Sequence, residues 1–540
     1  MMTSGASLHA LETVILLLLI VVAIFAVIAH RLKVPYPIVL VLAGLVISFV
    51  PHMPRVRLDP SLVFLIFLPP LLYSAAWGTS WREFRHNLVL ISLLAVGLVG
   101  FTVWGVAVVS EHFITALDWK AGFLLGAVVA TTDAIAATSI AKSIGLPRRI
   151  VDILEGESLL NDATGLLALE LGVSIIMQGT APSVGGGLLR LLYLLVGGVG
   201  IGLLIGVIVG WLEKFIDDGP VEIVVSVVVP YAAYLAGEHI HASGVLAVVA
   251  CGLYLSRKSA TFFSPAVRMQ VMGVWDALTF ILNGLVFVLI GLQLPYVLAG
   301  IRGQYGLVTL LEYGGIFSAI LIALRMVWVY PAVKMAYLLR RWAGHEEKQP
   351  DARNVFVIGW TGMRGVLALA AAISVPEVLG DGKMFGPRNL IVFLAFCVIL
   401  LTLVVQGLTL PSLIRALGLA GSTGMSTEER EARKIALEEA IAYLEDARKS
   451  RGDAYFHAFD DILHRYEHRL EDIESAHCDD ENEHGGQTYR RVVDAGEGAV
   501  QAERRAIIRL RDEGRISDDV LRTMERELDL EERRYQVARL

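Results

Sequence analysis

The sequence predicts an all-α polytopic membrane protein that ends in a soluble helical region. The chain has 540 residues, 55% of them hydrophobic, and its mean hydropathy of +0.62 lies above the usual balance of a soluble domain. Of its 46 basic and 53 acidic residues, 50 lie between Gly421 and Leu540. We therefore predict two domains, a transmembrane domain over 1–420 and a cytoplasmic helical tail over 421–540.

Apolar segments of membrane-spanning length recur through the first domain, separated by short polar or basic turns. They predict about 13 transmembrane helices, several of them short or rich in glycine. The segments lie near 8–30, 35–50, 60–77, 87–110, 121–142, 150–177, 186–212, 221–237, 243–256, 271–293, 306–333, 355–375 and 389–414.

Lysine and arginine in the loops predict the orientation, because cytoplasmic loops carry an excess of both. With the N-terminus outside, the inner loops hold Arg31, Lys33, Arg82, Arg85, Lys142, Arg148, Arg149, Lys214, Arg257, Lys258, Arg268, Lys334, Arg340, Arg341, Lys348 and Arg353. The outer loops hold only Arg55, Arg57, Lys120, Arg302, Lys383 and Arg388. This asymmetry favours a multi-pass protein of the cell membrane with its C-terminal tail in the cytoplasm.

The sixth segment carries acidic and polar residues inside the apolar stretch Ile150–Met177. Ser158 and Asp162 are four residues apart, so both lie on one helix face. Glu157 and Asn161 have the same spacing. A carboxylate at mid-membrane depth costs about 2.5–3.5 kcal/mol on insertion scales, and such residues usually move ions. Oxygen groups gathered on one face suit a small, hard cation.

The fifth segment is interrupted by polar residues near its middle. The run Ala130–Ser139 holds three threonines, a serine and Asp133. This composition suits a helix that unwinds where it lines a polar cavity, with backbone carbonyls freed to bind a cation. The alternative is that Thr132 and Asp133 only hold neighbouring helices together through hydrogen bonds.

The twelfth segment contains three glycines and an arginine. The run Gly359–Gly365 permits a helix break or close packing, and Arg364 within it would lie inside the membrane. A buried arginine without a partner is costly, so we expect a carboxylate beside it, Glu157 as first choice and Asp133 as second. Arg325 is either a second internal counter-ion or a residue near a helix end that reaches lipid phosphates.

Taken in this order and spacing, the three segments resemble the sodium/proton exchangers, the NhaP and NHE branch of the monovalent cation/proton antiporters. Most of the first domain is covered by stretches similar to that family. They are Gly126–Gly172, Tyr234–Glu238, Ser243–Ala247, Asn283–Leu292 and Trp360–Leu369. The resemblance implies inverted repeats with broken helices and a mobile ion-binding core.

The resemblance also implies an ion site. Asp162 would take Na⁺ or H⁺ in turn, and it follows Asn161, where the electrogenic branch of the superfamily carries a second aspartate. Further roles around the ion are implied for Thr132, Asp133 and Ser158. The monovalent cation would be held at Asp162, Ser158 and Thr132.

For Glu157 and Arg364 the resemblance implies a structural ion pair that keeps the helices in register. For the whole chain it implies electroneutral exchange of Na⁺, or of Li⁺ or K⁺, for H⁺ by alternating access, with no enzyme activity and no cofactor. The expected partners are these ions, the lipid bilayer and a second copy of the chain in a homodimer, and no nucleic acid.

Two other classes of function fit part of the pattern. A membrane aspartyl protease would also use two intramembrane acids, but neither Asp133 nor Asp162 has the Gly-x-Gly-Asp context of such enzymes. A cation channel or a membrane-bound ion sensor is the remaining alternative. A channel is not favoured, because the sequence has no filter-like Gly-Tyr-Gly loop.

Glycines also recur in the seventh segment, over Gly197–Gly202 and at Gly206 and Gly210. They predict a packing face of small residues, and this face is a candidate dimer interface.

The tail pattern predicts a small helical bundle. Apolar positions recur at helical spacing over Glu428–Ser450 and Ala454–Ile473, before an acidic, glycine-containing break at Asp479–Gly486. Two further helices follow, and Ser517 is placed to cap the last one. A solvated helix face is favoured over a metal or proton sensor for His457, His464 and His468.

Overall fold

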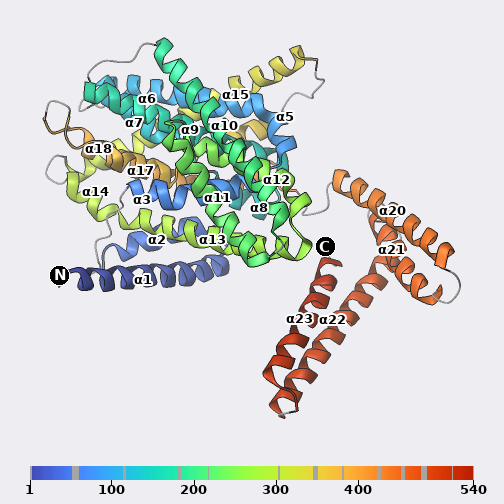
Figure 1. Ribbon diagram of the computed structural model, residues 1–540. Helices are drawn as coiled ribbons and strands as arrows, with labels where there is room; N and C mark the ends of the chain where they lie inside the picture. Colours follow the sequence, from blue (N-terminus) through green and yellow to red (C-terminus); the bar gives the residue numbers. More distant parts are fainter. Residues whose placement is uncertain are drawn as a thin grey trace. The chain divides into compact units, whose positions relative to one another are not determined.

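The computed structural model of the chain forms two compact units, Met1–Ser422 (unit 1) and Thr423–Leu540 (unit 2). Figure 1 shows that both are built from helices. The residues that the structure describes are 3–50, 60–113, 117–178, 184–216, 218–301, 305–344, 351–379, 382–421, 427–451, 456–475, 483–513 and 515–538. Arg55, Arg57, Arg302 and Lys348, which the predicted orientation used, lie outside these residues.

Unit 1 contains a helix at each of the predicted apolar segments. The α-helices are α1 (Thr3–Leu32), α2 (Tyr36–Ile47), α3 (Pro60–Leu62), α4 (Leu68–Gly78), α5 (Trp81–Ser92), α6 (Val99–Phe113), α7 (Trp119–Ala130), α8 (Ala134–Ile144), α9 (Arg148–Gln178), α10 (Val184–Leu212), α11 (Gly219–His239), α12 (Gly244–Phe262), α13 (Pro265–Leu292), α14 (Leu294–Ile301), α15 (Leu307–Trp342), α16 (Ala352–Trp360), α17 (Val366–Ser374), α18 (Arg388–Leu401) and α19 (Gly407–Ala416). Short π-helical stretches, Val63–Phe67, Leu93–Leu98 and Thr402–Gln406, join α3 to α4, α5 to α6 and α18 to α19.

The all-α polytopic fold is confirmed, although the count of 13 spans is not. Within the residues described, ten helical stretches are long and apolar enough to cross a membrane, and α2 is a shorter apolar helix. The difference between the 13 predicted spans and these ten stretches arises mainly at the broken or polar helices. For example, α16 and α17 are each only nine residues long.

Two of the predicted spans are broken in the middle, as their composition predicts. The helix pair α7–α8 is separated by Thr131–Asp133, and the pair α16–α17 by Thr361–Gly365. A long helical segment precedes each pair and another follows it. The order α5–α6, α7–α8, α9 therefore recurs as α15, α16–α17, α18–α19, which is the order that a structural repeat produces.

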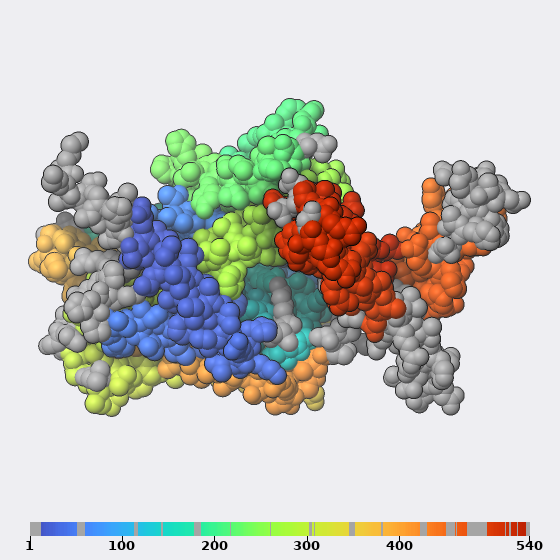
Figure 2. All heavy atoms as spheres, turned by 90° about the horizontal axis from the view of Figure 1, so that it is seen from below, coloured from blue at the N-terminus to red at the C-terminus, as the bar shows by residue number. Residues whose placement is uncertain are grey.

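The broken helices lie in the packed core, whereas α1 and α10 lie at the periphery. Most of the apolar stretch Trp119–Ala141 is buried, while most of α1 and α10 is exposed. Figure 2 shows α1, in dark blue, on the surface turned to the viewer. The exposed side chains of both peripheral helices are largely aliphatic, which suits contact with lipid tails.

Several glycines of α10 pack inside the chain, whereas a Cβ atom at Gly200 would meet nothing within 4 Å. A Cβ atom at Gly198 would lie 2.7 Å from the carbonyl oxygen of Ser243, and one at Gly202 would overlap the backbone of Ala247. Gly206 faces Tyr254 of α12 in the same way. The predicted packing face is therefore correct, and α12 of the same chain occupies it at these three glycines. The candidate dimer interface on α10 stays a prediction. The homodimer itself stays a prediction.

Unit 2 consists of four helices, α20 (Thr427–Arg451), α21 (Phe456–Ser475), α22 (Glu483–Asp512) and α23 (Asp518–Ala538). The Ser517 hydroxyl accepts a hydrogen bond from the Val520 backbone N–H at 3.3 Å, so the predicted cap of the last helix is confirmed. A small apolar core joins α22 and α23 through Val500, Ile507, Leu521 and Leu528.

Two details of the tail differ from the prediction or fall outside the structure. The helix α22 begins at Glu483, so Gly485 and Gly486 are helical and the predicted break is shorter than Asp479–Gly486. Its first part, 479–482, lies outside the residues described. His464 and His468 are exposed, with their Nε2 atoms 3.1 Å apart, whereas the side chain of His457 lies outside the described residues.

Candidate ion-binding site

The two broken helices contact each other at their unwound segments. The backbone N–H of Asp133 donates a hydrogen bond of 2.9 Å to the carbonyl oxygen of Met363. The chains approach so closely that a Cβ atom at Gly365 would overlap the Asp133 carboxylate. Only glycine fits at this position, which explains one of the three glycines in the twelfth predicted segment.

The helix α9 is tied to the unwound residue Thr132 by a short chain of hydrogen bonds. The Ser158 hydroxyl donates to the Thr132 carbonyl at 2.9 Å and accepts from the Ala134 backbone N–H at 3.3 Å. The Thr132 hydroxyl donates to the Glu157 carboxylate at 3.1 Å and accepts from the Asn161 amide. The structure thus brings together Thr132, Ser158, Glu157 and Asn161.

Asp162 lies in the same region of α9, but none of the described residues holds its carboxylate. Its side chain is 8% exposed, and no described residue forms a hydrogen bond or an ion pair with it. The amide oxygen of Asn161, which is 1% exposed, also lacks a hydrogen-bond partner among the described residues. Buried polar oxygens are normally paired, so the unpaired Asn161 oxygen, on the residue next to Asp162, indicates a place for a ligand.

Asp133 is held by backbone groups. Its carboxylate accepts a hydrogen bond of 2.8 Å from the backbone N–H of Ile135, in the first turn of α8. Its other oxygen lies against Gly365, where α17 begins. The acid therefore sits between the N-terminal ends of two half-helices, where the helix dipoles stabilise negative charge.

Glu157 pairs with Arg325 of α15, which corrects the predicted pairing with Arg364. The Arg325 Nη2 donates to Glu157 Oε2 at 2.9 Å, and Nη1 donates to Oε1. Both side chains are almost completely buried, at 2% and 1% exposure. Arg325 reaches the site because position 362 is glycine, where a Cβ atom would overlap the arginine stem. Of the two alternatives for Arg325, this geometry favours the internal counter-ion.

Arg364 binds backbone carbonyl oxygens, although the sequence predicts a carboxylate as its partner. Its Nε donates to the Val129 carbonyl at 2.7 Å and its Nη1 to the Gly362 carbonyl at 2.6 Å. Val129 lies in the last turn of α7, whose unpaired carbonyls carry partial negative charge. Arg325 makes the equivalent contacts at the end of α16, to the carbonyls of Ile358 and Gly359. Each broken helix therefore has a buried arginine at its carbonyl end.

The formal charges of the site do not cancel. Three carboxylates, those of Asp133, Glu157 and Asp162, face two guanidinium groups, those of Arg325 and Arg364. One negative charge remains when all five groups are ionised. A single monovalent cation or a single proton neutralises it, and burial in a low-dielectric core makes an uncompensated charge costly.

Comparison with known proteins decides the family. The model of the family described as sodium/hydrogen exchanger, transmembrane, matches residues 15–416. The chain belongs to this family. The match covers the whole arrangement of broken helices and α9 described above, and leaves out the tail.

Relatives and a solved structure agree with this assignment. The chain is 33% identical over 527 residues to an uncharacterized Na(+)/H(+) exchanger of Mycobacterium tuberculosis, covering 96% of this chain and 95% of the relative. It is 33% identical over 415 residues to the Na(+)/H(+) antiporter ApNhaP of Aphanothece halophytica, covering 76% and 75%. The fold is similar to that of the sodium proton antiporter MjNhaP1 of Methanocaldococcus jannaschii, with a TM-score of 0.57 at 19% identity over 77% of this chain and 99% of the other. These relatives are ion antiporters and not enzymes.

Sequence reasoning missed two contacts of this exchanger site. The first is the identity of the Glu157 partner, although an arginine inside an apolar segment gave a signal for Arg325. The second is Thr402, whose hydroxyl accepts a hydrogen bond of 3.2 Å from the backbone N–H of Arg364. Thr402 lies in a long apolar run, and nothing in that run predicts a contact with the unwound segment.

Proposed function

We propose that the protein exchanges Na⁺, or Li⁺ or K⁺, for H⁺ without net charge movement, and that Asp162 binds the cation and the proton in turn. The observation that supports this most directly is that Asp162 is buried while no described residue pairs with it. The neighbouring acids Glu157 and Asp133 are held by Arg325 and by backbone groups.

The cation would be held by this carboxylate and by oxygen atoms of neighbouring residues on α9 and on the unwound segment between α7 and α8. The Asn161 amide oxygen has no hydrogen-bond partner among the described residues and is available as a second ligand. Thr132 and Ser158 supply further oxygens, which have spare lone pairs beside their present hydrogen bonds. Sodium, lithium and potassium all accept oxygen ligands, so this donor set leaves the preferred cation open.

The charge balance supports one-for-one exchange. Without a bound ion the site keeps one negative charge, which is costly to carry across the low-dielectric part of the membrane. With one Na⁺ or one H⁺ bound, the site is neutral and can change its exposure from one side to the other. Alternating access then couples the two gradients without ATP. The N-terminus lies outside and the tail in the cytoplasm in this scheme, in agreement with the distribution of basic residues.

The test uses the full chain in proteoliposomes with an imposed pH gradient. Addition of Na⁺, Li⁺ or K⁺ dissipates this gradient if the protein exchanges that ion. We expect Asp162→Asn to abolish the flux, since an amide cannot exchange a proton for a cation. The matched control is Glu170→Gln, which removes an exposed acid from the same helix and should leave exchange intact. Robust cation-driven proton flux in Asp162→Asn would overturn the proposed role of this residue.

A further inference from the structure

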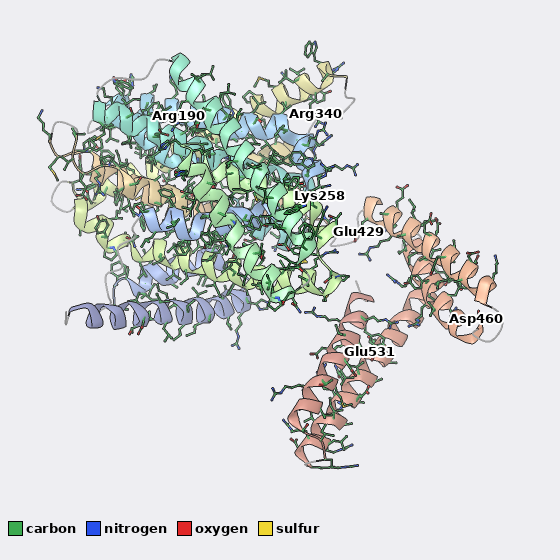
Figure 3. The ribbon with its side chains drawn as sticks, viewed as in Figure 1. Arg190, Lys258, Arg340, Glu429, Asp460 and Glu531 are labelled. Atoms are coloured by element: carbon green, nitrogen blue, oxygen red, sulfur yellow. The ribbon has the colours of Figure 1, made fainter. Side chains whose placement is uncertain are left out.

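Three polar side chains follow one face of α13 into the packed part of unit 1. Trp275, Thr279 and Asn283 are spaced four residues apart, so they lie one above the other on the same side of the helix. The first two are partly buried, and Asn283 is buried, with 4% exposure. Lys258, which Figure 3 labels, lies near the end of α12, just before α13 begins. We refer to the three residues as the α13 stripe.

The first two residues of the α13 stripe use their polar groups to bind neighbouring helices. The Trp275 Nε1 donates a hydrogen bond of 3.1 Å to the Ser226 hydroxyl of α11. The Thr279 hydroxyl contacts the Trp275 carbonyl, and it lies 3.2 Å from the Ser74 hydroxyl of α4. Hydrogen bonds between side chains of this kind hold helices together inside a membrane. These two positions therefore have a structural explanation.

Asn283 differs, because its amide oxygen has no hydrogen-bond partner among the described residues. The Asn283 side chain is hydrogen-bonded to the Tyr36 hydroxyl, in the first turn of α2. The Tyr36 ring packs against the Phe280 ring of α13, with 5.8 Å between the ring centroids. Since the oxygen is unpaired, the amide nitrogen makes the contact with Tyr36. The oxygen is left buried and unsatisfied, which is costly unless a ligand completes it.

The same pair of residues lies next to the ion-binding site. The Asp133 carboxylate acts electrostatically on the Tyr36 hydroxyl, so Tyr36 lies within its electrostatic reach. The helix α13 also contacts α17, which begins after Gly365, beside Asp133. The unsatisfied oxygen of Asn283 is therefore a neighbour of the site, although it comes from a helix outside the broken pairs.

From these contacts we infer that Asn283 is an accessory cation ligand, which receives the cation on α13 beside the site between the broken helices. An amide oxygen is a suitable ligand for a hard cation. Tyr36 positions the amide by contacting its nitrogen, which leaves the oxygen available. The amide is neutral, so this ligand leaves the formal charge of the site unchanged. The inference rests on the proposed exchange of a monovalent cation for a proton.

The transport test compares Asn283 with Thr279, one turn away on the same stripe. Asn283→Leu keeps a similar shape and removes the oxygen. In proteoliposomes with an imposed pH gradient, we expect the apparent KM for the transported cation, among Na⁺, Li⁺ and K⁺, to rise about tenfold, with the maximal rate within about twofold of the wild type. Thr279→Val removes a hydroxyl that already has partners and should leave this KM unchanged. Asn283→Asp keeps an oxygen in place and should not raise it.

A binding measurement checks the result without transport. A cation that binds the folded chain raises its melting temperature in detergent, and choline chloride at the same concentration controls for ionic strength. We expect Asn283→Leu to reduce the increase caused by the cation. Thr279→Val should keep this increase, although its melting temperature without the cation is lower. Asn283→Ala is the second variant, and it serves the same comparison where the leucine variant fails to fold.

Three outcomes would contradict the inference or its basis. An unchanged KM and an unchanged cation-dependent increase in Asn283→Leu would overturn the role of Asn283, while cation exchange by the wild type would still support the proposed function. An equal rise in KM in Thr279→Val would overturn it too, because the packing of α13 would then set the affinity. If the wild type exchanged no cation, the proposed function would fail, and the melting temperatures would still decide whether Asn283 binds a cation.

Discussion

Two successive turns of α9 carry buried acids that differ in what surrounds them. Glu157 accepts two hydrogen bonds from Arg325 and one from Thr132, so its charge is fully compensated. Asp162, five residues later, has no such partner among the described residues. The same helix thus presents one acid whose charge is paired and one whose charge no described residue pairs. An acidic residue inside a membrane predicts function in general, and only its partners show which function.

The largest expected difference between Glu157 and Asp162 is in how their substitution changes the free energy of unfolding. Glu157→Gln leaves the Arg325 guanidinium buried without its counter-ion, which typically costs about 3–5 kcal/mol. Asp162→Asn removes a buried charge that has no partner among the described residues, so it should leave the free energy of unfolding unchanged or raise it. The measurement is denaturant unfolding of each variant in the same detergent.

A double-mutant cycle sharpens this prediction. Glu157→Gln combined with Arg325→Gln should recover part of the loss, because neither charge is then left alone. The matched control combines Glu157→Gln with Arg364→Gln, whose guanidinium binds carbonyl oxygens and not Glu157. Coupling to Arg364 as strong as that to Arg325 would show that the pairing seen in the structure is not the one in solution.

The contrast between predicted and observed pairing shows what a sequence determines at such a site. The unwinding at Thr131–Asp133 follows from local composition, since polar residues and freed backbone groups need a polar cavity. The choice between Arg325 and Arg364 as the partner of Glu157 does not follow from local composition. It depends on how α15 packs against α16, where Gly362 leaves room for the Arg325 stem. Contacts of that kind join residues 168 positions apart, and no spacing rule reaches them.

The second largest effect concerns the glycines that bring these charges together. Gly362→Ala would push against Arg325, and Gly365→Ala against the Asp133 carboxylate. Overpacking of this kind costs about 1–3 kcal/mol. Gly273→Ala on α13 is the control, because a methyl group there meets no atom within 4 Å. We expect lower melting temperatures for the first two variants and an unchanged or higher one for the third. If Gly273→Ala lowered the melting temperature as much as the other two variants, the effect would come from helix propensity or lipid contact and not from overpacking.

A smaller effect is expected at Asp133, the acid held by backbone groups. Asp133→Ala removes the acceptor for the Ile135 N–H at the start of α8, and loss of such a cap costs about 0.5–2 kcal/mol. Asp133→Asn keeps a carbonyl oxygen in the same place and should recover most of the stability. The comparison of the two melting temperatures tests whether the cap or the charge matters here. Equal destabilisation by both variants would show that the charge between the two half-helices is the main contribution.

The smallest effect is expected from the membrane potential, and it tests the charge balance of the whole site. If Arg325 compensates Glu157 and only Asp162 changes its ligand, one cation enters for each proton that leaves, and no net charge moves. Clamping the potential of proteoliposomes at different values with valinomycin and K⁺ should then leave the rate of Na⁺-driven proton exchange nearly constant. A rate that scales with the potential would mean that a second acid also exchanges its proton during transport. Asp133 would be the residue to examine, because no arginine among the described residues pairs with it. Repeating the clamp with Asp133→Asn would show whether the voltage dependence disappears with its charge.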